Sequence, residues 1–235
     1  MTDQQQHISS AFHRDLTDLN ELLQNLGNLA CNQFEKAIDG LATQNEKDLD
    51  EIITGDVVLD ELEATIHEKA IEVMALRSPR AKDLRYVLVA LKVATILERT
   101  GDYARNIANR TKVISAAGNE NIPGVNIGRM GQVTQEMVRD VMRAYAQNDA
   151  ELALAVWRRD VEVDHMHTTF YREVLASMTR DPNLVASGVH LLFIAKNIER
   201  IGDYATGIAE QVHFLVTGAV PKENRPKADK TSKVI

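Results

Sequence analysis

Hydrophobic side chains recur at intervals of three and four residues along most of this chain. Near the N-terminus the spacing is carried by Phe12, Leu16, Leu19 and Leu23. Such a period places the apolar positions on one face of an α-helix. The pattern predicts helices over residues 8–43, 46–76, 78–117, 131–147, 148–179 and 181–217.

Three of these expected helices begin with capping signals. Ser78-Pro79 and Asp181-Pro182 each place a capping residue before a proline, which is tolerated at the first helical position because that N–H has no partner there. Asn148, with Glu151 three residues later, resembles a capping box. We therefore expect helices to start at each of these positions.

Two segments interrupt the helical pattern. Residues 118–128, GNENIPGVNIG, are rich in Gly and Asn and predict a linker. Residues 219–235 are charged and contain proline, so we expect a disordered tail. The chain then divides into two three-helix repeats, over residues 1–117 and 129–218. The predicted fold is all-α, with two tandem three-helix bundles.

One charged phrase occurs twice, late in the third helix of each repeat. ERTGDYARNIA covers residues 98–108, and ERIGDYATGIA covers residues 199–209. The two versions share eight of eleven positions, which favours an internal duplication. Gly101 and Gly202 lie in mid-helix, where glycine costs about 1 kcal/mol relative to alanine, so we expect a neighbouring helix to approach closely there. The repeated tyrosines, Tyr103 and Tyr204, are expected in the core.

Acidic residues spaced four apart form four pairs. Residues at this spacing share a helix face, so each pair points two carboxylates in the same direction. The helix connections near Ser78 and Asp181 bring two pairs to the same level in each repeat, given a rise of about 1.5 Å per residue. The pairs are Asp56/Asp60, Glu98/Asp102, Asp160/Asp164 and Glu199/Asp203.

Four convergent carboxylates suit a hard cation. Oxygen-only ligands favour Mg, Ca, Mn or ferric iron over Zn. The same acids would also suit a solvated face, because Val89 and Val93 lie on the side of their helix opposite Glu98. Repetition of the acids in both halves favours ligands, and we expect shallow metal sites near the surface.

The repeated phrase resembles the twin motif of the PhoU family, whose members regulate bacterial phosphate uptake. The matching residues are 98–108 and 199–205, with PRAKDLR at 79–85 and HFLVTG at 213–218 also similar. The resemblance covers about residues 7–218. It implies two three-helix bundles and metal bound at the Glu-x-x-x-Asp pairs as multinuclear clusters of varying metal. It also implies a non-enzymatic dimer that restrains the phosphate ABC transporter, through its ATPase subunit, and couples it to a membrane sensor histidine kinase.

The resemblance is incomplete in the second repeat. The family often extends its motif to Glu-x-x-x-Asp-x-x-x-Asn, which implies Asn106 as a further ligand. Gly207 stands at the corresponding position of the second repeat, so that site would lack one oxygen. Glu210, one turn later, is a possible substitute.

Composition narrows the functional classes. The formal net charge of -7, with no basic run outside the tail, argues against nucleic acid. A single cysteine and a polar N-terminus predict a cytoplasmic protein without membrane insertion. We find no catalytic Ser/His/Asp set and no phosphate-binding glycine loop.

Two other functions stay open at this point. One is a carboxylate-bridged di-metal enzyme, suggested by Asp164-x-x-His167. That class needs the pattern on a second helix, where Gly101 and Gly202 stand instead of histidine, and we expect neither His67 nor His167 to be a ligand. The other is a helical adaptor whose acids bind nothing.

Overall fold

The computed structural model describes residues 3–118, 127–222, 225 and 227–233. Its described residues form six long helices and no β-strand, which confirms the all-α prediction. No helix in the described part of the chain combines the length and the apolar character that crossing a membrane requires. The helices are α1 (Asp3–Thr43), α2 (Glu46–Arg77), α3 (Lys82–Ala116), α4 (Ile127–Gln147), α5 (Ala150–Arg180) and α6 (Val185–Thr217).

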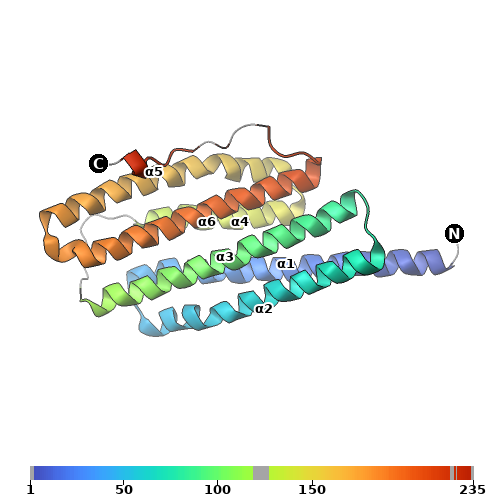
Figure 1. Cartoon of the computed structure of the whole chain (residues 1–235), viewed down its shortest axis with the longest axis horizontal. Coiled ribbons are helices and arrows are strands. Elements are labelled where there is room, and N and C mark those ends of the chain that lie inside the picture. Colours follow the sequence, from blue (N-terminus) through green and yellow to red (C-terminus); the bar gives the residue numbers. More distant parts are fainter. Residues whose placement is uncertain (1–2, 119–126, 223–224, 226, 234–235) are drawn as a thin grey trace.

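The six helices form two antiparallel three-helix bundles. Helices α1, α2 and α3 make the first bundle, and α4, α5 and α6 make the second (Figure 1). The bundles lie side by side along their length, and α3 contacts α6 where they meet. The two copies of the repeated phrase lie on these two helices.

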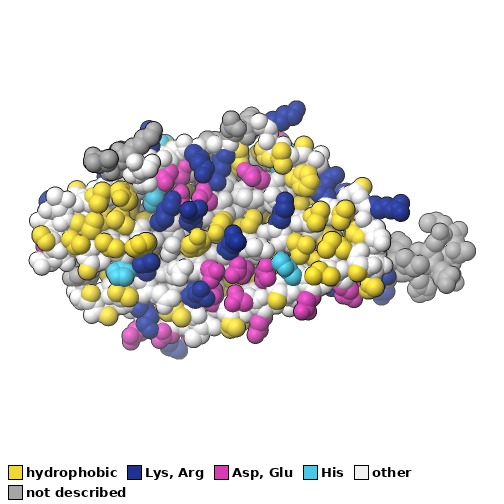
Figure 2. Space-filling view, in the orientation of Figure 1, with side chains coloured by type: hydrophobic (Ala, Val, Ile, Leu, Met, Phe, Trp, Pro, Cys, Tyr) yellow, Lys and Arg dark blue, Asp and Glu magenta, His cyan; other side chains and the backbone are white. Residues whose placement is uncertain are grey.

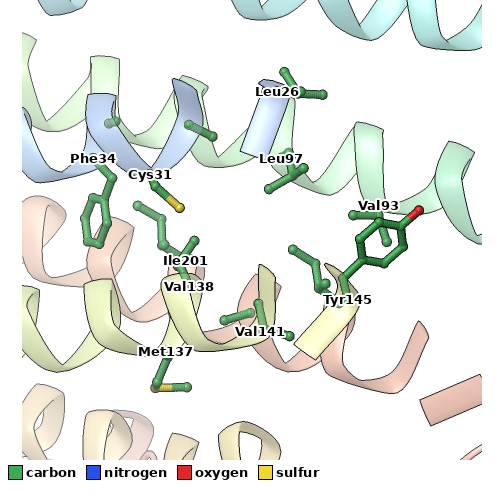
Figure 3. Packing of buried hydrophobic residues seen from close by; sticks show 14 of the residues in the cluster. Leu26, Cys31, Phe34, Val93, Leu97, Met137, Val138, Val141, Tyr145 and Ile201 are labelled. Carbon is green, nitrogen blue, oxygen red and sulfur yellow. The ribbon is translucent and has the colours of Figure 1, made fainter. Parts of the chain in front are cut away.

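One hydrophobic core runs through both bundles. Leu26 and Phe34 of α1 and Leu97 of α3 are fully buried. They lie opposite Val141 of α4 and Ile201 of α6, as Figure 3 shows. Burying a side chain of this size contributes about 1.5–3 kcal/mol. Because these residues come from both repeats, the two bundles stabilise each other.

The connection between α2 and α3 differs from the prediction. Ser78 adopts a left-handed backbone, with φ of 46°, and ends α2 rather than capping α3. α3 begins only at Lys82, after Ala81 with φ of 48°, and no side chain caps it. The expected start at Ser78-Pro79 was therefore wrong, because the left-handed residue closes the preceding helix.

In the second repeat, aspartates cap α5 and the short 3-10 helix before α6. Asp149, not Asn148, caps α5 by accepting hydrogen bonds from two backbone N–H groups, while Asn148 takes the left-handed turn position with φ of 53°. Asp181 caps a short 3-10 helix, Pro182–Leu184, that leads into α6. The capping role of Asp181 is thus confirmed, and the predicted cap at Asn148 was wrong by one residue.

The tail differs most from expectation. Its described residues turn back from the end of α6 and run along α5 and α6, instead of being disordered (Figure 1). The backbone N–H of Ala228 donates to Asp164 Oδ2 at 2.7 Å, and that of Lys230 donates to Thr168 Oγ1 at 3.1 Å. The tail is held by polar contacts, so its sequence carries no hydrophobic periodicity. The pattern of the chain therefore could not predict that the tail docks. Most of the expected linker, residues 119–126, lies outside the described residues.

Candidate metal centres

The two copies of the repeated phrase contact each other. The rings of Tyr103 on α3 and Tyr204 on α6 stack with their centroids 5.5 Å apart. Both side chains are half-buried at the boundary between the bundles, rather than fully inside the core as expected. The repeated tyrosines therefore join the two repeats.

The repeated glycines allow a neighbouring helix to pack closely. A Cβ atom on Gly101 would lie 2.5 Å from Leu59 Cδ2 of α2. At Gly202 the nearest atoms, from Asp160 and Val163 of α5, would lie 3.5 Å away, an ordinary contact. The first bundle thus needs its glycine for packing, and the second does not.

This difference predicts opposite effects of two matched substitutions. Gly202→Ala should stabilise the protein by up to about 1 kcal/mol, because alanine is the better helix former and fits. Gly101→Ala should instead destabilise the protein, because overpacking against Leu59 costs about 1–3 kcal/mol and outweighs the gain in helix propensity. Urea denaturation of the two variants checks this prediction. Equal destabilisation by both changes would contradict it.

We define the first acid cluster as Asp56 and Asp60 of α2 with Glu98 and Asp102 of α3. The guanidinium of Arg105 spans two of its members: Nη1 pairs with Asp56, and Nη2 lies 2.6 Å from Asp102 Oδ1. Asp56 is only 3% exposed, whereas Asp60 is exposed. The structure therefore brings the two predicted pairs together across α2 and α3, with one deeply buried member.

The first acid cluster is electrostatically strained. Burial, the charge of Asp102 and a hydrogen bond with it raise the pKa of Glu98 to about 7, and the charges of Asp60 and Glu63 add to the shift. Burial also raises the pKa of Asp56, although the Arg105 guanidinium opposes this shift. Carboxyl groups that resist ionisation in this way gain from a nearby cation.

The second acid cluster consists of Asp160 and Asp164 of α5 with Glu199 and Asp203 of α6. Here the tail supplies the cation: Arg225 Nη2 lies 2.6 Å from Asp160 Oδ2 and also pairs with Asp203. Asp160, Asp164 and Glu199 are all at most 5% exposed. Burial raises the pKa of both Asp160 and Glu199.

The two clusters place an arginine in the same role. Arg105 joins Asp56 to Asp102, and Arg225 joins the corresponding Asp160 to Asp203. The residue of the second phrase that corresponds to Arg105 is Thr206. The tail arginine therefore replaces a cation that the second phrase lacks. The roles of both arginines were missed in the sequence, although the change from Arg105 in the first phrase to Thr206 in the second was a visible signal.

Asn106 and Glu210 lie in different surroundings. Asn106 lines a surface hollow with Arg99, Asp102 and the two tyrosines of the repeated phrase. Glu210 Oε1 accepts a hydrogen bond from Trp157 Nε1 at 3.1 Å. Glu210 is therefore engaged by Trp157 of α5. This contact argues against Glu210 taking the place of the asparagine that the second phrase lacks at Gly207.

The first acid cluster offers oxygen donors at a partly exposed position. Acidic side chains gather over the middle of α2 and α3, and a smaller group lies over α5 and α6 beside Lys and Arg (Figure 2). Oxygen donors around a partly exposed position suit Mg²⁺, Mn²⁺ or iron. To bind at either cluster, a metal must displace the arginine that now joins its carboxylates.

Known proteins share both the sequence and the fold of this chain. A family model of the PhoU domain matches residues 23–111 and 127–212, once in each bundle. A phosphate-specific transport system accessory protein PhoU homolog from Caulobacter vibrioides is 38% identical over 224 residues, covering 95% of this chain and 97% of that relative. The Rhizobium meliloti homolog is 36% identical over 226 residues, covering 96% and 95%.

Solved structures agree with the sequence relatives. The crystal structure of PhoU from Pseudomonas aeruginosa has a TM-score of 0.85 and 31% identity, covering 88% of this chain and 100% of that one. The phosphate transport system regulatory protein PhoU from Streptococcus pneumoniae has a TM-score of 0.82 and 25% identity, covering 90% and 100%. The doubled domain, the doubled phrase and the paired bundles lead to one conclusion: this chain belongs to the PhoU family.

Proposed function

We propose that this chain is a negative regulator of high-affinity phosphate uptake and of the phosphate-starvation response. The observation that carries the proposal is the PhoU domain in both bundles. It is supported by relatives named as accessory proteins of the phosphate-specific transport system, which align over nearly the whole chain. The regulator acts from the cytoplasm by contact with the phosphate ABC transporter, through its ATPase subunit, and with a membrane sensor histidine kinase.

Protein contact is consistent with the surface. Several large apolar side chains are exposed on the outer faces of α3 and α6, including Leu88, Val189 and Phe193, each at least 40% exposed. Patches of exposed apolar side chains are typical of surfaces that bind partner proteins. A homodimer is part of the same proposal.

Metal binding at the acid clusters is the second part of the proposal. Bound Mg²⁺, Mn²⁺ or iron would neutralise carboxylates that the fold holds close together, and so would fix α2 against α3 and α5 against α6. The support is that the paired acids meet across two helices in each bundle, and that the pKa of Glu98, Asp56, Asp160 and Glu199 is raised.

Deletion of the gene should switch on phosphate-scavenging enzymes in phosphate-rich medium. Alkaline phosphatase activity is a convenient readout, and re-expression of the parent chain is the control. Complementation with Glu98→Gln/Asp102→Asn/Glu199→Gln/Asp203→Asn asks whether regulation needs the clusters, and we expect repression to be impaired. Repression that persists in the deletion strain would contradict the regulatory proposal.

We propose no catalytic role. A di-metal oxidase needs a histidine three residues after the acid on both helices, and this chain has Gly101 and Gly202 at those positions. Asp164, the acid before His167, is engaged by the tail instead. Oxidation of ferrous iron at enzymatic rates by the purified protein would overturn this part of the proposal.

A further inference from the structure

A histidine and two carboxylates meet where the tail crosses the second bundle. His167 of α5, Glu199 of α6 and Asp229 of the tail each present a ligand atom within 4.8 Å of the others. His167 and Glu199 are 3% and 5% exposed, and Asp229 is half-buried. Two of these residues lie outside the repeated phrase and its paired acids.

One ring nitrogen of His167 is left without a hydrogen bond in the described part of the chain. Among the described residues its Nδ1 has no hydrogen bond, although it is buried. The nearest carboxylate oxygen, Asp229 Oδ1, is 3.7 Å away, which is beyond hydrogen-bonding distance. A buried polar atom without a partner costs about 1–3 kcal/mol. Burial lowers the pKa of His167, so the ring is neutral and keeps a nitrogen lone pair for a ligand.

We propose that His167, Glu199 and Asp229 form a binding site for one divalent transition-metal ion, with the tail supplying the third ligand. A mixed nitrogen and oxygen set favours Zn²⁺ or ferrous iron over Mg²⁺, which prefers oxygen alone. The site differs in this respect from the oxygen-only acid clusters. It also links metal occupancy to docking of the tail.

The geometry needs a small adjustment to close around a metal. Ligand atoms of a tetrahedral zinc site lie roughly 3.4 Å apart, given bonds of about 2.0–2.2 Å. The present separation of up to 4.8 Å therefore requires a movement of roughly 1 Å. Asp229 lies in the tail, where its Oδ1 accepts hydrogen bonds from the backbone N–H and the hydroxyl of Thr231 at 2.9 and 2.8 Å. The movement therefore shifts this turn of the tail rather than α5 or α6.

Lys196 now takes the place of a cation. Its Nζ lies 2.8 Å from Glu199 Oε2 and 3.5 Å from Asp229 Oδ2. The lysine side chain is 40% exposed, so it can turn into solvent when a metal arrives. Lys196 is therefore a competitor of the metal, and its removal should tighten binding.

The docked tail separates this site from the rest of the second acid cluster. Arg225 pairs with Asp160 and Asp203, and the Ala228 N–H donates to Asp164. Glu199 is the member of that cluster that faces His167 and Asp229. With the tail in place, Asp160, Asp164 and Asp203 are engaged by tail groups, so a metal reaches the mixed site without displacing Arg225.

Competition titration of the full-length, metal-free chain with Zn²⁺ and a chromophoric chelator tests the site. Asp229→Asn and His167→Gln should each weaken one zinc-binding step at least tenfold, and Lys196→Met should tighten that step. His67→Gln is the matched control, because His67 is half-exposed on α2 and, among the described residues, pairs with Glu63 and Thr95 of the first bundle. It should leave the step unchanged.

Substitution with Co²⁺ gives a second readout. A visible absorption band that shifts in His167→Gln would show nitrogen coordination, and Glu98→Gln/Asp102→Asn, which leaves the contacts of the tail unchanged, should leave that band in place. The double variant separates this site from metal binding at the first acid cluster. Asp229→Asn alone decides the outcome if His167→Gln fails to fold. Unchanged zinc affinity in a folded Asp229→Asn or His167→Gln variant would overturn the proposal.

Discussion

Replacing Arg225 with alanine should destabilise the metal-free protein by about 2–3 kcal/mol. The guanidinium is 19% exposed and neutralises Asp160, which is 3% exposed, together with Asp203. Removing one partner of a buried ion pair leaves an uncompensated charge, which typically costs 3–5 kcal/mol, and the partial exposure here reduces that figure. The tail would lose its main charged contact with α5 and α6.

The same variant should respond more strongly to metal. With the arginine absent, the second acid cluster is open to a cation, so Mn²⁺ should raise the unfolding temperature of Arg225→Ala more than that of the parent chain. Arg105→Ala is the parallel variant and should show the same gain, because it removes the corresponding cation from the first acid cluster. Thermal unfolding with and without Mn²⁺ makes the comparison. An Arg225→Ala variant as stable as the parent chain would contradict the role that we assign to the tail.

Replacing Glu98 with glutamine should stabilise the metal-free protein at pH 8 by about 1–2 kcal/mol. The pKa of Glu98 is raised to about 7 from an ordinary value of 4.5. Each unit corresponds to 1.36 kcal/mol, and the partial solvent exposure of the side chain reduces the total. Glutamine keeps the shape of the side chain and cannot ionise.

The direction of the pH dependence follows from the raised pKa. The folded state binds the Glu98 proton more tightly than the unfolded state, so stability is greatest below pH 4.5 for this group and is lost as the pH rises through about 7. Denaturation of the metal-free parent chain between pH 5 and 8 should show this loss, and Glu98→Gln should flatten it. Glu61→Gln is the control, because Glu61 is exposed, and it should keep the pH profile of the parent chain. A Glu98→Gln profile identical to that of the parent chain would contradict the claim that the first acid cluster is electrostatically strained.

The helices could be predicted from the sequence because their hydrophobic faces repeat regularly. Leu19 and Leu23 were placed on one face, and both are fully buried. The helix ends were less predictable. Ser78 reads as an N-terminal cap by residue type, but its left-handed backbone ends the helix before it. A serine between two helices can begin the second helix or end the first, and residue preference alone does not decide between them.

The acid pairs could be predicted from their spacing, but their counterions could not. Four-residue spacing correctly brought Asp56 to the face that meets Asp102, and Asp160 to the face that meets Asp203. Arg225 lies in a polar segment without periodicity, so nothing in the pattern indicated that it reaches α5. The same is true of Asp229, whose distance in sequence from His167 hides their proximity.

The duplication is less symmetric in the structure than in the sequence. The first acid cluster uses Arg105 from its own helix, whereas the second uses the tail. A Cβ atom on Gly101 would lie 2.5 Å from Leu59 Cδ2, whereas one on Gly202 would make only ordinary contacts at 3.5 Å. We expect these differences to give the two bundles different metal affinities, with the tail controlling access to the second.

Elemental analysis tests the central claim that the repeated phrase is a set of metal ligands. The protein should be purified without added metal or a histidine tag, beside Glu98→Gln/Asp102→Asn/Glu199→Gln/Asp203→Asn. We predict stoichiometric metal in the parent chain and its loss from the variant. Absence of metal from both proteins, even after incubation with Mg²⁺, Mn²⁺ or ferric iron, would contradict the claim and leave the phrase as a packing motif between the repeats.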